Sequence, residues 1–232
     1  APFYLLLGRI FSLLALGNTE NIALAINFLS VIASSFTILF LFWSITHLSK
    51  KLLTPDTNNN IILIILCGFT GSMVFTFSDS FWFSAVEAEV YAMSSFFTAF
   101  VFWAILKWET IESESDQNKW IILIAYMMGL SIGVHLLNLV TIPALGLIIY
   151  FKKSNKTSFI GLISSLLISS FIIILIIEGI IPGLPSIASF IERFFVNSIG
   201  LPFGSGIIFF IILCISSLVY LIRYSHIKEK II

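Results

Sequence analysis

The sequence predicts an all-α protein that crosses a membrane about seven times and begins with a helix in the membrane plane. Of its 232 residues, 59% are hydrophobic and only 10% are charged, and the mean hydropathy is +1.08. Soluble domains contain about 45–50% apolar residues. Apolar runs long enough to span a bilayer recur along the chain. Basic residues also gather at alternate ends of these runs, as expected for a polytopic protein.

The first apolar segment, residues 1–16, is too short to cross a hydrocarbon core of about 30 Å, because a helix rises about 1.5 Å per residue. Arg9 gives this segment one charged side. We therefore predict an in-plane or re-entrant helix.

Seven spans follow. Residues 120–151 are too long for one straight crossing and too short for two ideal ones, so we predict a break near His135–Asn138 with a short, tilted return helix. Three prolines in residues 178–203 predict a loop, with a short amphipathic piece at 187–195 and a surface pair of Glu192 and Arg193. The predicted spans are 21–47, 61–77, 90–108, 120–133, 134–151, 159–177 and 206–224.

We expect a single transmembrane domain over residues 1–232, with signature-bearing helices at 21–151 and C-terminal helices at 157–225. The chain starts at Ala1, without Met and inside an apolar segment. We therefore expect it to be a fragment of a longer protein.

Passing these spans alternately through a membrane places ten of the twelve basic residues on one side. Only Arg9 and Arg193 fall on the other side, and the positive-inside rule assigns the ten to the cytoplasm. The ten are Lys50, Lys51, Lys107, Lys119, Lys152, Lys153, Lys156, Arg223, Lys228 and Lys230.

Composition also excludes several classes. The net charge is zero and no basic stripe with interleaved aromatics occurs, so no nucleic-acid partner is expected. Cys67 and Cys214 lie inside apolar runs and indicate little about the redox compartment. The sequence has no CxxC, HExxH, P-loop or GxGxxG motif, and no metal site is indicated.

An acidic stretch between the second and third spans carries Asp79, Glu87 and Glu89. Ionisable groups near a bilayer are costly and usually functional, so these acids are candidates for a base, a metal ligand or a sugar-hydroxyl acceptor. Glu87 and Tyr91 are four apart and share a helix face. The alternative is helix capping, because Ser84 and Glu87 match a capping box.

His135 and Asn138 are three apart, at the outer end of a span, and can share one face to bind a phosphate or a sugar hydroxyl. The alternative is an interhelical hydrogen bond that satisfies both groups. The pair Gly129 and Gly133 predicts a helix-packing groove. Arg9 matches phosphate geometry, or else extends to lipid headgroups.

Residues 81–91 (FWFSAVEAEVY) and 129–139 (GLSIGVHLLNL) closely resemble two signature stretches of the DUF2723 membrane family. That family has bacterial members and includes the TMEM260-type protein O-mannosyltransferases. Residues 1–9 also resemble the family segment that follows a His-Pro-Pro-Gly turn. The resemblance covers most of residues 1–151.

This resemblance implies a GT-C-like membrane glycosyltransferase that moves a sugar from a polyprenyl-phosphate-linked donor to an extracytoplasmic acceptor. It also implies that the catalytic acid lies upstream of Ala1, which would leave this fragment inactive alone. The expected sugar- and acceptor-binding residues are Asp79, Glu87, Glu89 and Tyr91, and the expected lipid-phosphate-binding residues are Arg9, His135 and Asn138.

The expected partners are membrane lipids, the lipid-linked donor and a protein or glycan acceptor, with no further cofactor; a divalent metal is allowed but not indicated. The expected location is a bacterial inner membrane, with the active side facing the periplasm. Two alternatives stay open: a transporter or flippase with a mid-membrane site at the broken helix pair, and a non-catalytic membrane subunit. A transporter concentrates polar groups at mid-membrane depth, whereas here they gather at one rim.

Overall fold

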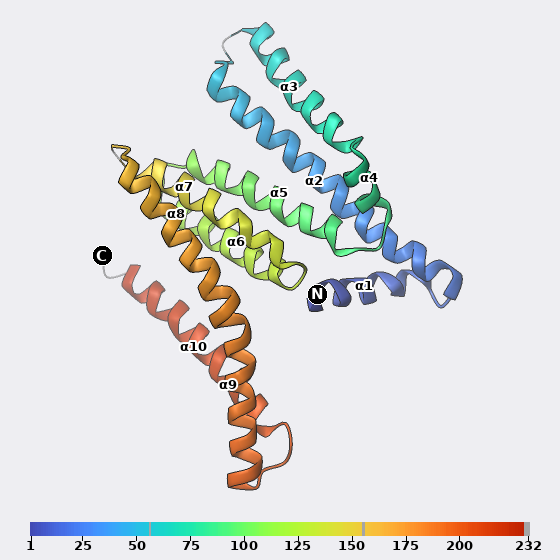
Figure 1. Cartoon of the computed structure of the whole chain (residues 1–232), viewed down its shortest axis with the longest axis vertical. Helices are drawn as coiled ribbons and strands as arrows, with labels where there is room; N and C mark the ends of the chain where they lie inside the picture. Colours follow the sequence, from blue (N-terminus) through green and yellow to red (C-terminus); the bar gives the residue numbers. More distant parts are fainter. Residues whose placement is uncertain (56, 155, 230–232) are drawn as a thin grey trace. The chain divides into compact units, whose positions relative to one another are not determined.

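The computed structural model describes residues 1–55, 57–154 and 156–229, and side chains as far as Tyr224. Lys228 and Lys230 of the predicted basic set therefore lie outside the described side chains. Every regular element in the described residues is a helix (Figure 1), as predicted. The α-helices are α1 (Pro2–Ser12), α2 (Ile22–Leu52), α3 (Asn58–Thr76), α4 (Asp79–Val86), α5 (Val90–Glu109), α6 (Glu114–Ile132), α7 (Ile142–Lys153), α8 (Phe159–Ile174), α9 (Ile181–Phe194) and α10 (Ser205–Glu229). The short 3₁₀ and π segments are η1 (Leu13–Ala15), η2 (Thr19–Asn21), η3 (Leu136–Thr141), η4 (Leu175–Ile180) and η5 (Phe195–Ile199).

Six helical segments in the described residues are long and apolar enough to cross a membrane. They confirm the multi-pass, all-α class and correspond to six of the seven predicted spans. The seventh prediction, residues 120–133, falls on the apolar part of α6, whose first turns are charged. Helix α1 is apolar but too short to count as a span. The six segments are 19–52, 58–76, 90–109, 136–153, 159–199 and 205–224.

The described chain divides into two compact units, residues 1–170 and 171–232. In the first unit, α5 is the central helix and packs against α2, α4, α6, η3 and α7. Its inward positions are closely packed, and Val101, Ala104 and Ile105 are fully buried. The helix is interrupted between α6 and α7, where His135 is extended and the 3₁₀ turn η3 follows it. The predicted break is therefore confirmed.

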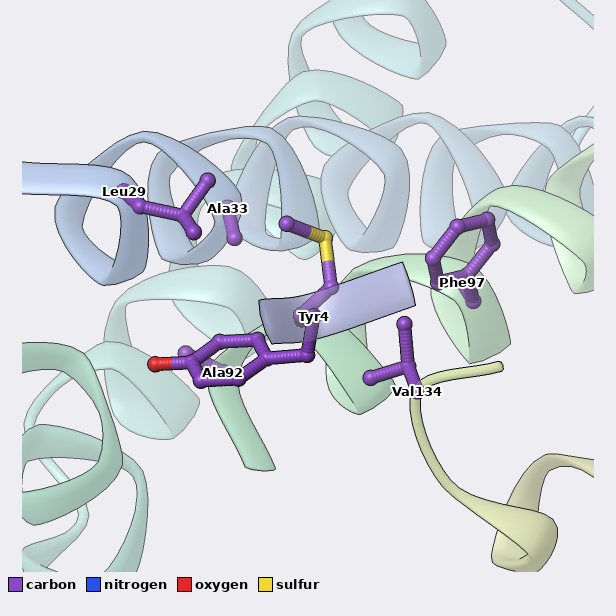
Figure 2. Close-up of a cluster of buried hydrophobic side chains, with 7 residues drawn as sticks. Tyr4, Leu29, Ala33, Ala92, Phe97 and Val134 are labelled. Atoms are coloured by element: carbon purple, nitrogen blue, oxygen red, sulfur yellow. The ribbon is translucent and has the colours of Figure 1, made fainter. Parts of the chain in front are cut away.

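One buried cluster joins α1 to the long helices at the end of the first unit where α5 begins. In Figure 2 the ring of Tyr4 lies beside Ala92, and its hydroxyl points away from Phe97. The cluster consists of Tyr4, Leu29, Ala33, Ala92, Met93, Phe97 and Val134. Small side chains on α2 and α5 leave room for the large ones, so α1 is held against both helices.

Helix α1 also contacts the end of α6. The Phe3 amide donates to the Gly133 carbonyl at 2.9 Å. A Cβ built on Gly133 would lie 2.7 Å from the Phe3 Cβ, whereas one on Gly129 would meet nothing within 4 Å. Of the two glycines predicted to form a packing groove, only Gly133 therefore lies at a close helix contact.

In the second unit the predicted loop at 178–203 is wrong for residues 178–199, while the non-helical connection is confined to residues 200–204. Residues 175–199 are helical throughout, as η4, α9 and η5. Pro182 lies just after the junction of η4 and α9, inside continuous helix, and Pro185 lies within α9. The wide π turn η4 ends two residues before Pro182 and changes the backbone hydrogen-bond register there, and a second π turn, η5, follows α9.

The predicted surface pair of Glu192 and Arg193 is also wrong, because Glu192 is buried. Its carboxylate accepts hydrogen bonds from the backbone N–H groups of Gly204 and Ile207, the latter at 2.9 Å. Glu192 therefore caps the beginning of α10 from α9. A side chain on Gly206 would collide with the Glu192 backbone, which explains the glycine there.

Candidate functional site

The first unit has two chemically different ends. At one end, Lys51 forms an ion pair with Glu109. At the same end Lys152 of α7 donates to the carbonyls of Trp108 and Ile111, at 2.7 Å each. We call this end the lysine rim. The opposite end holds α1, α4, the α4–α5 link and the α6–η3 turn, and we call it the acidic rim.

Aromatic packing positions the acids of the acidic rim. Phe81 of α4 is buried, and its ring lies 4.6 Å from that of Phe75 on α3. Helix α4 then ends at Val86, and the chain runs extended through Glu87 and Glu89 before α5 begins at Val90. The Glu89 amide donates to the Glu87 carbonyl at 2.9 Å. This bond closes a three-residue turn around Ala88.

The capping explanation for Glu87 is wrong. Ser84 lies inside α4, where its hydroxyl donates to the Ser80 carbonyl, and Glu87 follows the end of that helix. Both Glu87 and Glu89 are exposed, and neither carboxylate forms a hydrogen bond or ion pair with a described group. Two acidic groups are therefore available to accept hydrogen bonds from a ligand.

Tyr91 and His135 meet beside this link. Their ring centroids are 5.6 Å apart, although the residues belong to α5 and to the turn after α6. The Nδ1 atom of His135 accepts the Leu137 amide at 3.1 Å. A neutral imidazole that accepts at Nδ1 carries its proton on Nε2. Nε2–H is then left as a donor for an anion or a hydroxyl.

Asn138 does not share a face with His135. His135 has extended backbone ahead of η3, so helical spacing does not apply to the pair. Asn138 is 2% exposed, and its Oδ1 accepts from Ser94 at 2.9 Å and Thr98 at 2.8 Å. The alternative prediction is an interhelical hydrogen bond that satisfies both His135 and Asn138. It is correct for the Oδ1 atom of Asn138, whereas His135 bonds only within its own turn in the described part of the chain. The Nδ2 atom of Asn138 is buried and has no partner among the described groups.

Tyr4 is a polar residue at the acidic rim that the sequence did not single out. Its hydroxyl and that of Ser30 are both buried, and neither reaches hydrogen-bonding geometry with a described group. Burial, the largest effect, raises the pKa of Tyr4; the Ser30 hydroxyl opposes this, and the charge of Glu89 adds to it. Tyr4 lies in an apolar run, so its hydroxyl is the only feature of the sequence that could have identified it as a candidate.

The two remaining predicted residues are Asp79 and Arg9. In the described part of the chain, neither forms a hydrogen bond or ion pair with Tyr91 or His135. Asp79 begins α4 and lines an open hollow of about 610 Å³ with Phe77, Trp82 and Phe83. Arg9 is exposed on α1, with its guanidinium 3.4 Å from the Ser12 hydroxyl. No group of three or more His, Cys, Asp or Glu residues capable of holding a metal occurs in the described part of the chain.

The chain matches a known protein family. The family model described as the protein O-mannosyl-transferase TMEM260 N-terminal domain matches residues 1–158. This range covers both signature stretches and the whole acidic rim. No curated protein and no solved structure matches the chain.

Proposed function

Because the chain belongs to the family of the protein O-mannosyltransferase TMEM260 N-terminal domain, we propose that it forms the membrane part of a glycosyltransferase that uses a polyprenyl-phosphate-linked sugar. The acceptor is a hydroxyl group of a protein. The acidic rim is the proposed site of sugar and acceptor binding.

The reaction is a direct displacement. The acceptor oxygen forms a bond to the anomeric carbon, the bond from that carbon to the phosphate oxygen breaks, and the polyprenyl phosphate leaves with the electron pair. A carboxylate takes the proton of the acceptor hydroxyl. Such a site needs hydrogen-bond acceptors for hydroxyl groups and donors for the leaving phosphate.

Glu87 and Glu89 provide the acceptors, because their carboxylates are exposed and unpaired within the described residues. Asp79 provides a further carboxylate on α4 for an extended sugar or acceptor. Exposed Tyr91, in the first turn of α5 just after the link, lies against His135. Glu87 precedes α5, so the predicted helix face shared by Glu87 and Tyr91 is wrong.

His135 and Arg9 supply donors for the phosphate. Because the Nδ1 atom of His135 accepts from the Leu137 amide, the Nε2–H of the neutral ring is free to donate to the phosphate. Arg9 is a permanent cation whose planar fork matches phosphate. Asn138 is a positioning residue, because its bonds to Ser94 and Thr98 fix η3 and hence the turn that carries His135.

We place the acidic rim on the outer side of a bacterial inner membrane. The support is the ten-to-two division of basic residues in the sequence and the positive-inside rule.

A single observation carries the proposal: two carboxylates without partners among the described residues lie on the short link that leads to Tyr91 and its contact with His135. The test is Glu87→Gln and Glu89→Gln in the full-length protein, with sugar transfer from a polyprenyl-phosphate-linked mannose measured in membranes. We expect a loss of about 10- to 100-fold for at least one variant, because the site would lose a charged hydrogen-bond acceptor for a sugar or acceptor hydroxyl.

Glu112→Gln is the matched control, since Glu112 is an exposed acid in the loop after α5, at the lysine rim. It should leave transfer unchanged. Unchanged transfer in both Glu87→Gln and Glu89→Gln would remove the acidic rim from the mechanism.

A further inference from the structure

The lysine rim of the first unit contains a pocket that the proposed sugar transfer does not use. It has a volume of about 410 Å³ and lies between α2 and α5. Its lining residues are Trp43, Thr46, His47, Lys50, Trp103 and Lys107. We propose that this pocket binds the headgroup phosphate of an anionic glycerophospholipid.

The pocket is built on two packed helices. On α2, Trp43, His47 and Lys50 are spaced four and three residues apart and so lie on one face. On α5, Trp103 and Lys107 are four apart and do the same. The Trp43 and Trp103 rings are 5.3 Å apart. The two indole rings therefore bridge α2 and α5 in the pocket that Lys50 and Lys107 also line.

The charges in the pocket lack counterions. Lys50 and Lys107 form no ion pair or side-chain hydrogen bond within the described residues. Neighbouring lysines of the same rim are already engaged, since Lys51 pairs with Glu109 and Lys152 bonds to backbone carbonyls. Glu109 is thus paired with a lysine that does not line the pocket. Two positive charges remain to attract an anion.

His47 also lines the pocket. Its Nε2 atom is buried and has no hydrogen-bond partner among the described groups, so this atom belongs to the wall of the pocket rather than to its open surface. Thr46 donates to the Trp43 carbonyl at 3.0 Å and closes the side of the pocket.

The position favours a lipid as the source of the phosphate. Trp residues in membrane proteins concentrate at the level of the headgroups, and basic pockets between transmembrane helices bind anionic headgroups there. Trp120 extends the indole layer, with its ring 5.7 Å from Trp103. The indoles can pack against the glycerol and upper acyl region, while Lys50 and Lys107 meet the phosphate.

The test uses purified full-length protein in nanodiscs of mixed phosphatidylcholine and phosphatidylglycerol. Native mass spectrometry reports which lipid stays bound after extraction. The wild type should retain phosphatidylglycerol preferentially, and the double variant Lys50→Gln/Lys107→Gln should lose about tenfold or more of that preference. A variant with Arg at both positions keeps the charges and should keep the preference.

Lys153→Gln/Lys156→Gln is the matched control, because it removes two exposed charges near the same rim but outside the pocket. It should retain the preference. An equal loss in this control, or an undiminished preference in Lys50→Gln/Lys107→Gln, would overturn the proposal. Displacement of the lipid by inorganic phosphate at low millimolar concentration would also overturn it, in favour of a site for a free anion.

Discussion

At the scale of single residues, Asn138 fastens the broken helix pair to the centre of the first unit. Its Oδ1 accepts from two hydroxyls on α5, Ser94 and Thr98, which are four apart on one face. The amide is buried in apolar surroundings, where hydrogen bonds are costly to lose. One side chain therefore decides where η3 lies on α5.

Asn138→Ala should lower the free energy of unfolding by about 1–3 kcal/mol, because two buried hydroxyls lose their acceptor. Denaturation by SDS of the detergent-solubilised protein measures the change. Asn118→Ala, at an exposed position of α6, is the control and should have little effect. Equal stability of the two variants would show that the Asn138 bonds contribute nothing net.

Residue roles at the acidic rim were only partly predictable from the sequence. Spacing predicted a shared face for His135 and Asn138, but an extended His135 abolishes the helical register. A capping role for Glu87 failed because a helix ends there and the next one begins three residues later. The contact between Tyr91 and His135 joins residues 44 positions apart, which no local pattern reveals.

At the scale of elements, the docking of α1 depends on one glycine. Gly133 lets the Phe3 backbone approach the end of α6, and the 2.9 Å hydrogen bond between them fixes the contact. Gly129 lies one turn away on the same helix with open space around it. The two glycines therefore form a natural comparison.

Gly133→Val should displace α1, since overpacking a close contact costs about 1–3 kcal/mol. Hydrogen–deuterium exchange over residues 2–12 should become faster, because α1 would lose its contact with α6. Gly129→Val should leave the exchange of α1 unchanged. Equal exchange in the two variants would contradict the docking role of Gly133.

Apolar spans were predictable because length and hydropathy alone determine them. The break after α6 was also predictable, since residues 120–151 fit neither one nor two ideal crossings. The helix at 175–199 was not, because its prolines indicate a loop and no local pattern predicts the π turn η4 that ends beside Pro182. The register of that turn depends on the whole segment rather than on any residue type.

At the scale of the whole molecule, the multi-pass topology makes a direct prediction about sidedness. Ser84 lies in α4 at the acidic rim, and Glu112 lies in the loop after α5 at the lysine rim. With Cys67 and Cys214 replaced by Ser, single cysteines at positions 84 and 112 should react with an impermeant maleimide from opposite sides of the membrane. Position 84 should react from the periplasmic side.

Reaction of both cysteines from the same side would overturn the topology and with it the outer location of the acidic rim. The result is independent of sugar transfer, so it separates an error in topology from an error in the assigned chemistry. The class of fold and the sidedness of the basic residues followed from the sequence, whereas the ion pair of Lys51 with Glu109 at the lysine rim needed the helix contacts as well.

Glu192 lies at the tip of the α9–α10 pair and closes the turn between these two helices. Its bonds to Gly204 and Ile207 span only 12 and 15 residues, so little chain entropy opposes their formation. The negative charge is satisfied by backbone N–H groups and requires no cation from elsewhere. The turn that joins α9 to α10 therefore depends on local contacts alone.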